Sequence, residues 1–228
     1  MAHADFPAYR GRMEYVCLDC GARHPGDSLL YTCPQCGGVF LLENLDFAKL
    51  KERSGQEWRQ IFDDRCATRV TALKGIFRYY ELLAPLLDQD DIVYLGEGIT
   101  PIVEAAPALR DQVGVSFAYK NDGQNPSASF KDRGMACAFS YLKWLCRRNK
   151  WDEVLTVCAS TGDTSAAAAL YASYVGAPLK SVVLLPHGKV TPQQLAQPLG
   201  SGATVLELPG VFDDCMKVVE LLAENYRV

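Results

Sequence analysis

The second half of the chain alternates between short apolar segments and longer segments of helical length, and this alternation restricts the fold more than any other feature. The apolar segments are partly β-branched, which favours strands. The expected strands are residues 117–120, 153–159, 181–185 and 204–208, and the expected helices are residues 130–149, 162–175, 192–199 and 211–224. Strand–helix–strand units build parallel sheets. The sequence therefore predicts an α/β core that binds ligands beyond the carboxyl ends of its strands.

Four cysteines near the N-terminus form two pairs. Two residues separate Cys17 from Cys20 and also Cys33 from Cys36, twelve residues lie between the pairs, and a glycine follows each pair. This spacing lets both sulfurs of a pair face one ion, and four thiolates close a tetrahedral shell with no position for water. We therefore expect a structural zinc ribbon in residues 1–45. The alternatives are iron in the same cage, a redox pair and reduced core cysteines.

The remaining cysteines have no metal-ligand spacing. The total of nine is odd and no secretory signal precedes them, so reduced thiols fit better than a disulfide framework. We expect the other five to be small apolar residues, most of them buried. They are Cys66, Cys137, Cys146, Cys158 and Cys215.

The overall composition is that of an ordinary globular protein. Of the 228 residues, 49% are hydrophobic and 22% are charged, and the net charge is −4. This charge gives no general attraction to nucleic acid or acidic lipid. The apolar runs are too short to cross a bilayer, and the first ten residues lack the centre of a signal peptide. A cytoplasmic protein with no membrane or nucleic-acid partner is expected, and a homo-oligomer is left open.

Residues 46–93 are expected to link the ribbon to the main body. Residues 46–54 and 58–66 suit short helices, and residues 74–87 have helical spacing that Pro85 should kink or end. Residues 95–101 contain two glycines and a Thr-Pro pair, so they should form a turn.

Lys131 stands in the first turn of the helix expected at residues 130–149. Unpaired N–H groups and the positive end of the helix dipole favour the neutral amine there, and partial burial acts in the same direction. A neutral lysine is a nucleophile that can form a Schiff base with an aldehyde cofactor. The alternative is an exposed lysine that follows a Ser129 cap.

A second loop precedes the helix expected at residues 162–175. Its small side chains and glycine would let a ligand approach the backbone, and the helix start would cradle a carboxylate. The alternative is a plain helix capped by Thr161 or Asp163. Because both loops precede helices, we expect them to open onto one edge of the sheet. The loop residues are Ser160, Thr161, Gly162, Asp163 and Thr164.

Taken together, these segments resemble pyridoxal-phosphate enzymes of the tryptophan-synthase-β type (fold type II), and threonine synthases among them. Residues 120–126 (KNDGQNP) and 129–134 (SFKDRG) look like the cofactor-lysine motif of that family. Residues 96–101 (GEGITP), 160–165 (STGDTS), 185–190 (LPHGKV) and 210–215 (GVFDDC) are similar to other family segments. The resemblance runs from about residue 94 to the end, and some members also carry a cysteine ribbon.

The resemblance implies roles for individual residues. Lys131 would hold pyridoxal 5'-phosphate covalently and move protons, and the loop at residues 160–164 would bind the substrate carboxylate. Asp163 stands where the family often has an asparagine at the cofactor's phenolic oxygen, although an ionised aspartate can only accept hydrogen bonds. Lys189, Arg133 and Lys120 are candidates for the substrate phosphate, with ordinary surface cations as the alternative.

The sequence also departs from the family pattern. Ser127 and Ala128 replace the more usual Thr-Gly, and Ala128 narrows the freedom of the backbone. The family's cofactor-phosphate loop and its residue at the pyridine nitrogen lie downstream of the segment that matches Val228. Residues 94–228 are therefore expected to be the first part of an incomplete α/β enzyme region.

The resemblance implies a lyase that converts O-phosphohomoserine and water to threonine and phosphate, so a phosphorylated amino acid is the expected small-molecule partner. One alternative keeps the fold and changes the reaction, to cysteate-synthase-like β-replacement or hydroxy-amino-acid dehydration. The other alternative is a catalytically silent, truncated module in which the ribbon and the α/β core serve binding or assembly.

Overall fold

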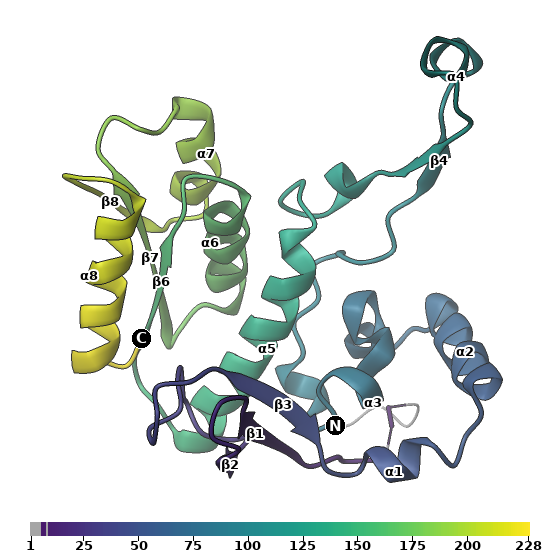
Figure 1. The fold of residues 1–228 in the computed structure, drawn as a ribbon, viewed down its shortest axis with the longest axis horizontal. Helices are drawn as coiled ribbons and strands as arrows, with labels where there is room; N and C mark the ends of the chain where they lie inside the picture. Colours follow the sequence, from purple (N-terminus) through teal and green to yellow (C-terminus); the bar gives the residue numbers. More distant parts are fainter. Residues whose placement is uncertain (1–5, 8) are drawn as a thin grey trace. The chain divides into compact units, whose positions relative to one another are not determined.

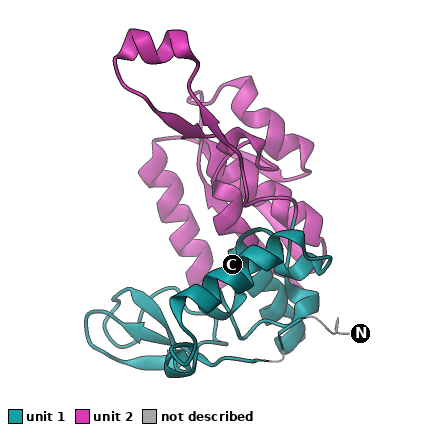
Figure 2. Cartoon of the chain, turned by 90° about the vertical axis from the view of Figure 1, so that its right-hand side faces the viewer, with its two compact units in different colours: residues 1–94, 137–151 teal, residues 95–136, 152–228 magenta. Residues whose placement is uncertain are grey.

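The computed structural model describes residues 6, 7 and 9–228, which divide into two compact units (Figure 2). Unit 1 comprises the described residues within 1–94 together with residues 137–151, and unit 2 comprises residues 95–136 and 152–228. Helix α5 (Lys131–Asn149) contributes residues to both units. The predicted division into residues 1–45, 46–93 and 94–228 stays a prediction.

Unit 1 contains a three-stranded antiparallel sheet with β1 in its centre. The strands are β1 (Met13–Cys17), β2 (Arg23–Pro25) and β3 (Phe40–Asn44), in the order β2-β1-β3. After each cysteine pair the chain turns back tightly, since the N–H of Gly21 donates to the carbonyl of Cys17 and that of Gly37 to Cys33. Both glycines have positive φ, at 73° and 76°, a conformation that suits glycine.

The rest of unit 1 is helical, largely as predicted. Its helices are α1 (Phe47–Leu50), α2 (Gly55–Asp64), α3 (Tyr80–Leu83) and the later part of α5. The segment at residues 74–87 forms a 3₁₀ turn and then α3. This helix ends at Leu83, because the next residue, Ala84, precedes Pro85 and a residue before proline disfavours helical backbone. Phe77, Tyr80 and Leu145 are fully buried in the core of this unit.

Unit 2 is built on a parallel sheet. It contains β6 (Val154–Ala159), β7 (Leu179–Pro186) and β8 (Thr204–Leu208) in the order β6-β7-β8. Helices α6 (Asp163–Val175) and α7 (Pro192–Gly200) pack on one face, and α8 (Phe212–Asn225) covers the other (Figure 1). The predicted α/β class and parallel sheet are confirmed.

The first predicted strand is placed differently. β5 (Ala118–Lys120) pairs antiparallel with β4 (Ile102–Glu104) in a separate two-stranded sheet, with α4 (Pro107–Val113) between them. This short connection suits an antiparallel pair, whereas a parallel pair needs a longer crossover. The expectation that the loops before α5 and α6 open onto one sheet edge is therefore wrong.

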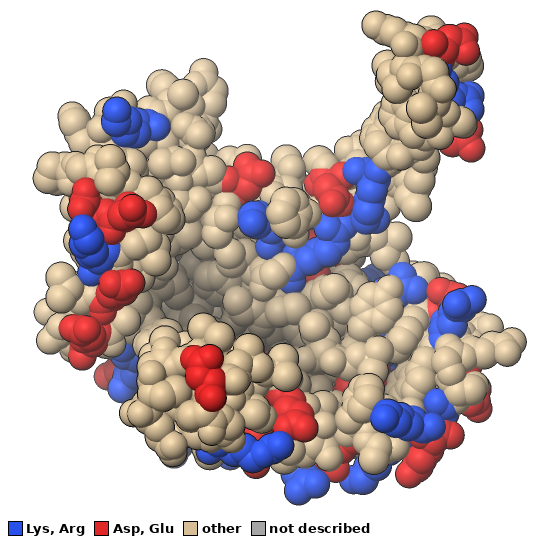
Figure 3. Space-filling view, viewed as in Figure 1, with Lys and Arg blue, Asp and Glu red and all other residues tan. Residues whose placement is uncertain are grey.

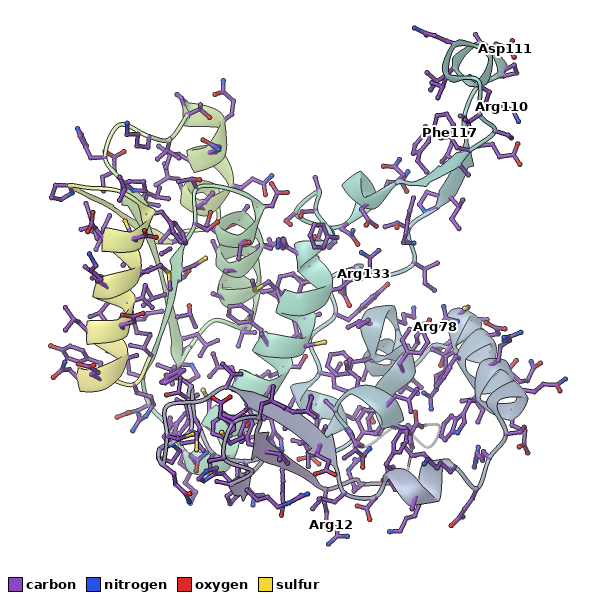
Figure 4. All side chains as sticks on the ribbon, in the orientation of Figure 1. Arg12, Arg78, Arg110, Asp111, Phe117 and Arg133 are labelled. Carbon is purple, nitrogen blue, oxygen red and sulfur yellow. The ribbon has the colours of Figure 1, made fainter. Side chains whose placement is uncertain are left out.

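A cluster of hydrogen bonds fastens the turn at residues 96–101 to the start of α5. Asp122 Oδ1 accepts from the Thr100 hydroxyl and from the Arg133 guanidinium, both at 2.7 Å. The same guanidinium donates to the carbonyl of Gly98 at 2.9 Å. Arg133 lies near the beginning of α5 in Figure 4. We call Thr100, Asp122 and Arg133 the turn clasp.

Two further side chains hold the loop that carries Lys131. The N–H of Gly98 donates to Asn125 Oδ1 at 3.2 Å, and Asn125 Nδ2 donates to the carbonyl of Asp122 at 2.9 Å. The N–H of Ser127 donates to the fully buried Asp132 at 2.8 Å. The loop is thus bonded on both sides of the lysine.

The same turn also reaches α6. Glu97 is only 1% exposed, and its carboxylate accepts from the Tyr171 hydroxyl of α6 at 3.2 Å and from the N–H of Leu95 at 3.1 Å. A buried carboxylate needs such donors to offset its lost hydration. The turn at residues 96–101 therefore binds both the first turn of α5 and the middle of α6.

Ala128 adopts a backbone conformation that glycine favours. Its φ is 63°, in the left-handed region, at the position where the resembled family usually has glycine. An L-residue with a Cβ is strained there. Alanine in place of the family's usual glycine therefore keeps the left-handed backbone at residue 128.

The described surface is of mixed charge. Lys and Arg side chains are interspersed with Asp and Glu on the face drawn in Figure 3. No helix in the described part of the chain has the length and apolar character needed to span a membrane.

Replacing Asp122 with Asn should lower stability in a pH-dependent way. Hydrogen bonds from Arg133 and Thr100 lower the pKa of Asp122 from 3.8 to about 2. A lowered carboxyl pKa stabilises the fold above the unfolded value, and this contribution disappears as the pH falls from about 4 to about 2. Urea midpoints of wild type and Asp122→Asn should differ most near pH 6 and converge toward pH 2. Asp111→Asn, at an exposed site on α4, is the control and should give parallel curves.

Replacing Ala128 with Gly should stabilise the protein. Relief of the left-handed strain exceeds the extra chain entropy of glycine by about 0.5–1 kcal/mol. The measurement is the free energy of unfolding in urea. Ala138→Gly, at an exposed position inside α5, is the matched control and should destabilise by about 1 kcal/mol. Equal losses in both variants would contradict the assignment of strain to Ala128.

Candidate functional site

Lys131 is the first residue of α5 and is half-buried. Its N–H donates to Ser129 Oγ at 3.3 Å, so the Ser129 cap exists. Its Nζ lies 4.7 Å from the centroid of the Phe130 ring. The cap and the partial burial occur together, which places the amine at the positive end of the helix dipole without full exposure to water.

The start of α6 has no side-chain cap. Gly162 occupies the N-cap position. Glycine has no side chain, so the first-turn N–H groups receive no hydrogen bond from an N-cap side chain. The alternative that Thr161 or Asp163 caps this helix is therefore wrong. Ser160 Oγ accepts from the N–H of Gly162 at 3.3 Å, and the Ser165 hydroxyl donates back to the Gly162 carbonyl at 2.8 Å. These bonds shape the loop and leave the helix start suited to an anionic group.

The two helix starts influence each other electrostatically. Burial raises the pKa of Asp132, which follows Lys131, and the negative charge of Asp163 at the start of α6 raises it further. Asp132 Oδ1 is buried and has no hydrogen-bond partner among the described residues. A buried polar atom without a partner is unusual in a folded protein.

These features fit an aldehyde cofactor that carries negative charge. Lys131 carries a half-buried amine, the side-chain group that condenses with aldehydes, and the start of α6, which lacks a side-chain cap, offers N–H donors of the kind that anions bind. Asp163 is exposed at the start of α6, and an ionised aspartate could only accept hydrogen bonds there. The roles assigned to Ser160, Thr161 and Thr164 stay predictions.

The three candidate phosphate ligands differ in their surroundings. Lys120 Nζ donates to the carbonyl of Thr100 at 3.0 Å, and Arg133 belongs to the turn clasp. Both cations therefore hold the turn. Lys189 is exposed on the turn that follows β7, at the same carboxyl edge of the sheet as the loop after β6. Of the three, its position best suits a ligand for an anion arriving from solvent.

The four paired cysteines converge as predicted. Their sulfurs all lie within 4.8 Å of one another, and Cys17–Cys36 and Cys20–Cys33 are separated by 3.5 and 3.7 Å. Zn–S bonds of about 2.3 Å in a tetrahedron require sulfur separations of about 3.8 Å. The geometry therefore fits a tetrahedral ion with four sulfur ligands.

The electrostatics of the cluster also call for a cation. Backbone N–H groups of Cys20 and Asp19 lower the pKa of Cys17 to about 7. The N–H of Gly38 lowers the pKa of Cys36, but the neighbouring thiols Cys20 and Cys17 raise it more, to about 12. Four thiolates are therefore not stable together by themselves, and a divalent ion would remove this conflict.

The prediction that most of the other cysteines are buried is wrong. Only Cys146 and Cys215 are buried, whereas Cys137 and Cys158 are half-buried and Cys66 is exposed. Cys66 lies in the 3₁₀ turn that follows α2, where the chain runs along the surface. Burial depends on which helix face meets the core, and a lone cysteine carries no signal for this.

The sequence did not lead us to expect that the turn at residues 96–101 is bonded to both α5 and α6. Glu97 binds this turn to Tyr171 of α6. Thr100 binds it to Asp122, which in turn accepts from Arg133 of α5. The available signal was a glutamate between two glycines in an apolar context. A turn alone does not need a charged residue there, so a buried partner was the better expectation.

Several curated proteins are similar to most of this chain. Threonine synthase from Methanocaldococcus jannaschii is 38% identical over 214 residues, which cover 92% of this chain and 46% of the relative. Threonine synthase from Methanosarcina acetivorans is 33% identical over 219 residues, covering 93% of this chain and 46% of the relative. The chain thus spans about half the length of these relatives.

A solved structure supports the fold. The pyridoxal-phosphate-bound threonine synthase from Brucella melitensis aligns with a TM-score of 0.55 at 20% identity, over 93% of this chain and 45% of that one. Residues 93–228 match the family described as "Pyridoxal-phosphate dependent enzyme", and this segment contains Lys131, the turn clasp and α6. The chain therefore belongs to the family of pyridoxal-phosphate-dependent enzymes.

Proposed function

We propose that this chain is the first part of a threonine synthase-like lyase that converts O-phosphohomoserine and water to threonine and phosphate. The half-buried Lys131 at the start of α5 is the observation that carries the proposal. The similarity to proteins named threonine synthase supports the choice of reaction.

The cofactor, when bound, supplies an electron sink for carbanions. Lys131 would hold the cofactor through its aldehyde and carry protons, since a lysine amine is the side-chain group that condenses with an aldehyde. The loop at residues 160–164 binds the substrate carboxylate through the free N–H groups at the start of α6. Lys189 attracts the substrate phosphate, since it is exposed at the same sheet edge.

The turn clasp gives this arrangement its rigidity. Arg133 lies two residues after Lys131, so the bonds from Arg133 to Asp122 and to Gly98 set the direction in which α5 starts. A reactive amine must stand within a fraction of an ångström of its working position. We therefore assign Arg133 a positioning role in place of the phosphate-binding role considered from the sequence.

Lys131→Ala should abolish covalent capture of the cofactor. The chain is incubated with pyridoxal phosphate and reduced with borohydride, and the modified peptide is mapped by mass spectrometry. We expect one major label, at Lys131, together with a visible absorption band that the variant lacks. Lys143→Ala, further along the same helix, is the control and should keep both signals. Labelling spread over surface lysines in the wild type would refute the proposed cofactor site.

The reaction itself is tested with substrates. Release of inorganic phosphate from O-phosphohomoserine together with threonine formation supports the proposal. Turnover of another phosphorylated or free hydroxy amino acid, without threonine, would favour β-replacement or dehydration. Labelling of Lys131 without turnover of any of these substrates would favour the silent module.

We also propose that Cys17, Cys20, Cys33 and Cys36 hold a structural zinc ion. The purified protein should contain one equivalent of zinc, and Cys33→Ser should lose most of it and unfold at a lower temperature. Cys66→Ser, at an exposed cysteine outside the cluster, should keep the zinc. Iron in place of zinc would be visible as colour and by metal analysis.

A further inference from the structure

His24 lies against the cysteine cluster without belonging to it. Its Nε2 is 3.8 Å from the sulfur of Cys33, a separation compatible with a hydrogen bond to sulfur. His24 is the central residue of β2 and is paired with Tyr15 of β1. The backbone ladder of the ribbon therefore determines where this ring stands.

A second contact fixes the orientation of the ring. The rings of His24 and Phe40 meet edge to face, with centroids 5.5 Å apart and planes at 71°. Phe40 is the first residue of β3 and pairs with Cys17 of β1. The imidazole is thus held between the Phe40 ring of β3 and the sulfur of Cys33.

The buried thiolates need donors from the protein. Cys17 and Cys33 are each only 2% exposed, whereas Cys20 and Cys36 are exposed. A buried charge is costly unless it is hydrogen-bonded. His24 Nε2 is placed to donate to the buried sulfur of Cys33.

We propose that His24 is a positioning residue of the metal site, which donates a hydrogen bond from Nε2 to the thiolate of Cys33 without binding the metal. This inference rests on the metal site proposed above. A thiolate only accepts hydrogen bonds, so Nε2 must carry the proton. The four sulfurs already have the spacing of a complete tetrahedral shell, which leaves no ligand position for an imidazole.

The test compares metal binding by the wild-type chain, His24→Phe and His24→Gln. Zinc affinity is measured by competition with a chromogenic chelator, and Co²⁺ is used as a spectroscopic probe. Loss of the donor should weaken zinc binding about 10-fold or more in His24→Phe, the usual effect of removing an outer-shell partner. His24→Gln keeps an N–H donor and should bind zinc more tightly than His24→Phe. It also serves as the informative variant if the Phe substitution fails to fold.

The Co²⁺ spectrum distinguishes a donor from a ligand. The wild type and His24→Phe should both show four-thiolate coordination, with the sulfur-to-cobalt charge-transfer band at longer wavelength in the variant, because an unbonded thiolate holds its electrons less tightly. His187→Phe, at an exposed histidine beyond β7, is the matched control and should change neither reading.

Two results would overturn the inference while leaving the metal site intact. One is unchanged zinc affinity together with an unchanged charge-transfer band in His24→Phe. The other is a wild-type Co²⁺ spectrum of three thiolates and one imidazole that becomes a four-thiolate spectrum in the variant. Failure of the wild type to bind either metal would instead refute the proposed zinc site, and the inference with it.

Discussion

The charged cluster of Asp122, Arg133 and Thr100 is the interaction on which unit 2 depends for its candidate site. It joins the turn at residues 96–101 to the start of α5, two segments that lie about 30 residues apart in sequence and are not paired strands of one sheet. A charge-assisted hydrogen bond is stronger and more directional than a neutral one. The cluster therefore fixes the beginning of α5, and Lys131 with it.

Glu97 extends this arrangement to α6. Its buried carboxylate accepts from Tyr171, so the turn that holds α5 also holds the helix whose start is uncapped. The influence of Asp163 on the pKa of Asp132 is consistent with this connection. The family match covers all of these residues.

In unit 1 the four-cysteine cluster is the interaction that joins the two ends of the ribbon. Crowded sulfurs conflict electrostatically unless a cation lies among them, and their spacing suits one tetrahedral ion. The three strands of the ribbon are too few and too short to bury a large core. Metal ligation would therefore supply stability that hydrophobic burial cannot, and donors such as His24 would serve the least exposed sulfurs.

The sequence by itself determined the features that depend on neighbouring residues. Helical and strand periodicity predicted the α/β class, the cysteine spacing predicted the cluster, and the helix expected at residues 130–149 placed Lys131 in a first turn. Tertiary structure alone decided the antiparallel pairing of β5 with β4, the burial of Glu97 against Tyr171 and the use of Arg133 as a clasp. The physical reason is that strand pairing and the burial of charges depend on partners distant in sequence, which local patterns do not encode.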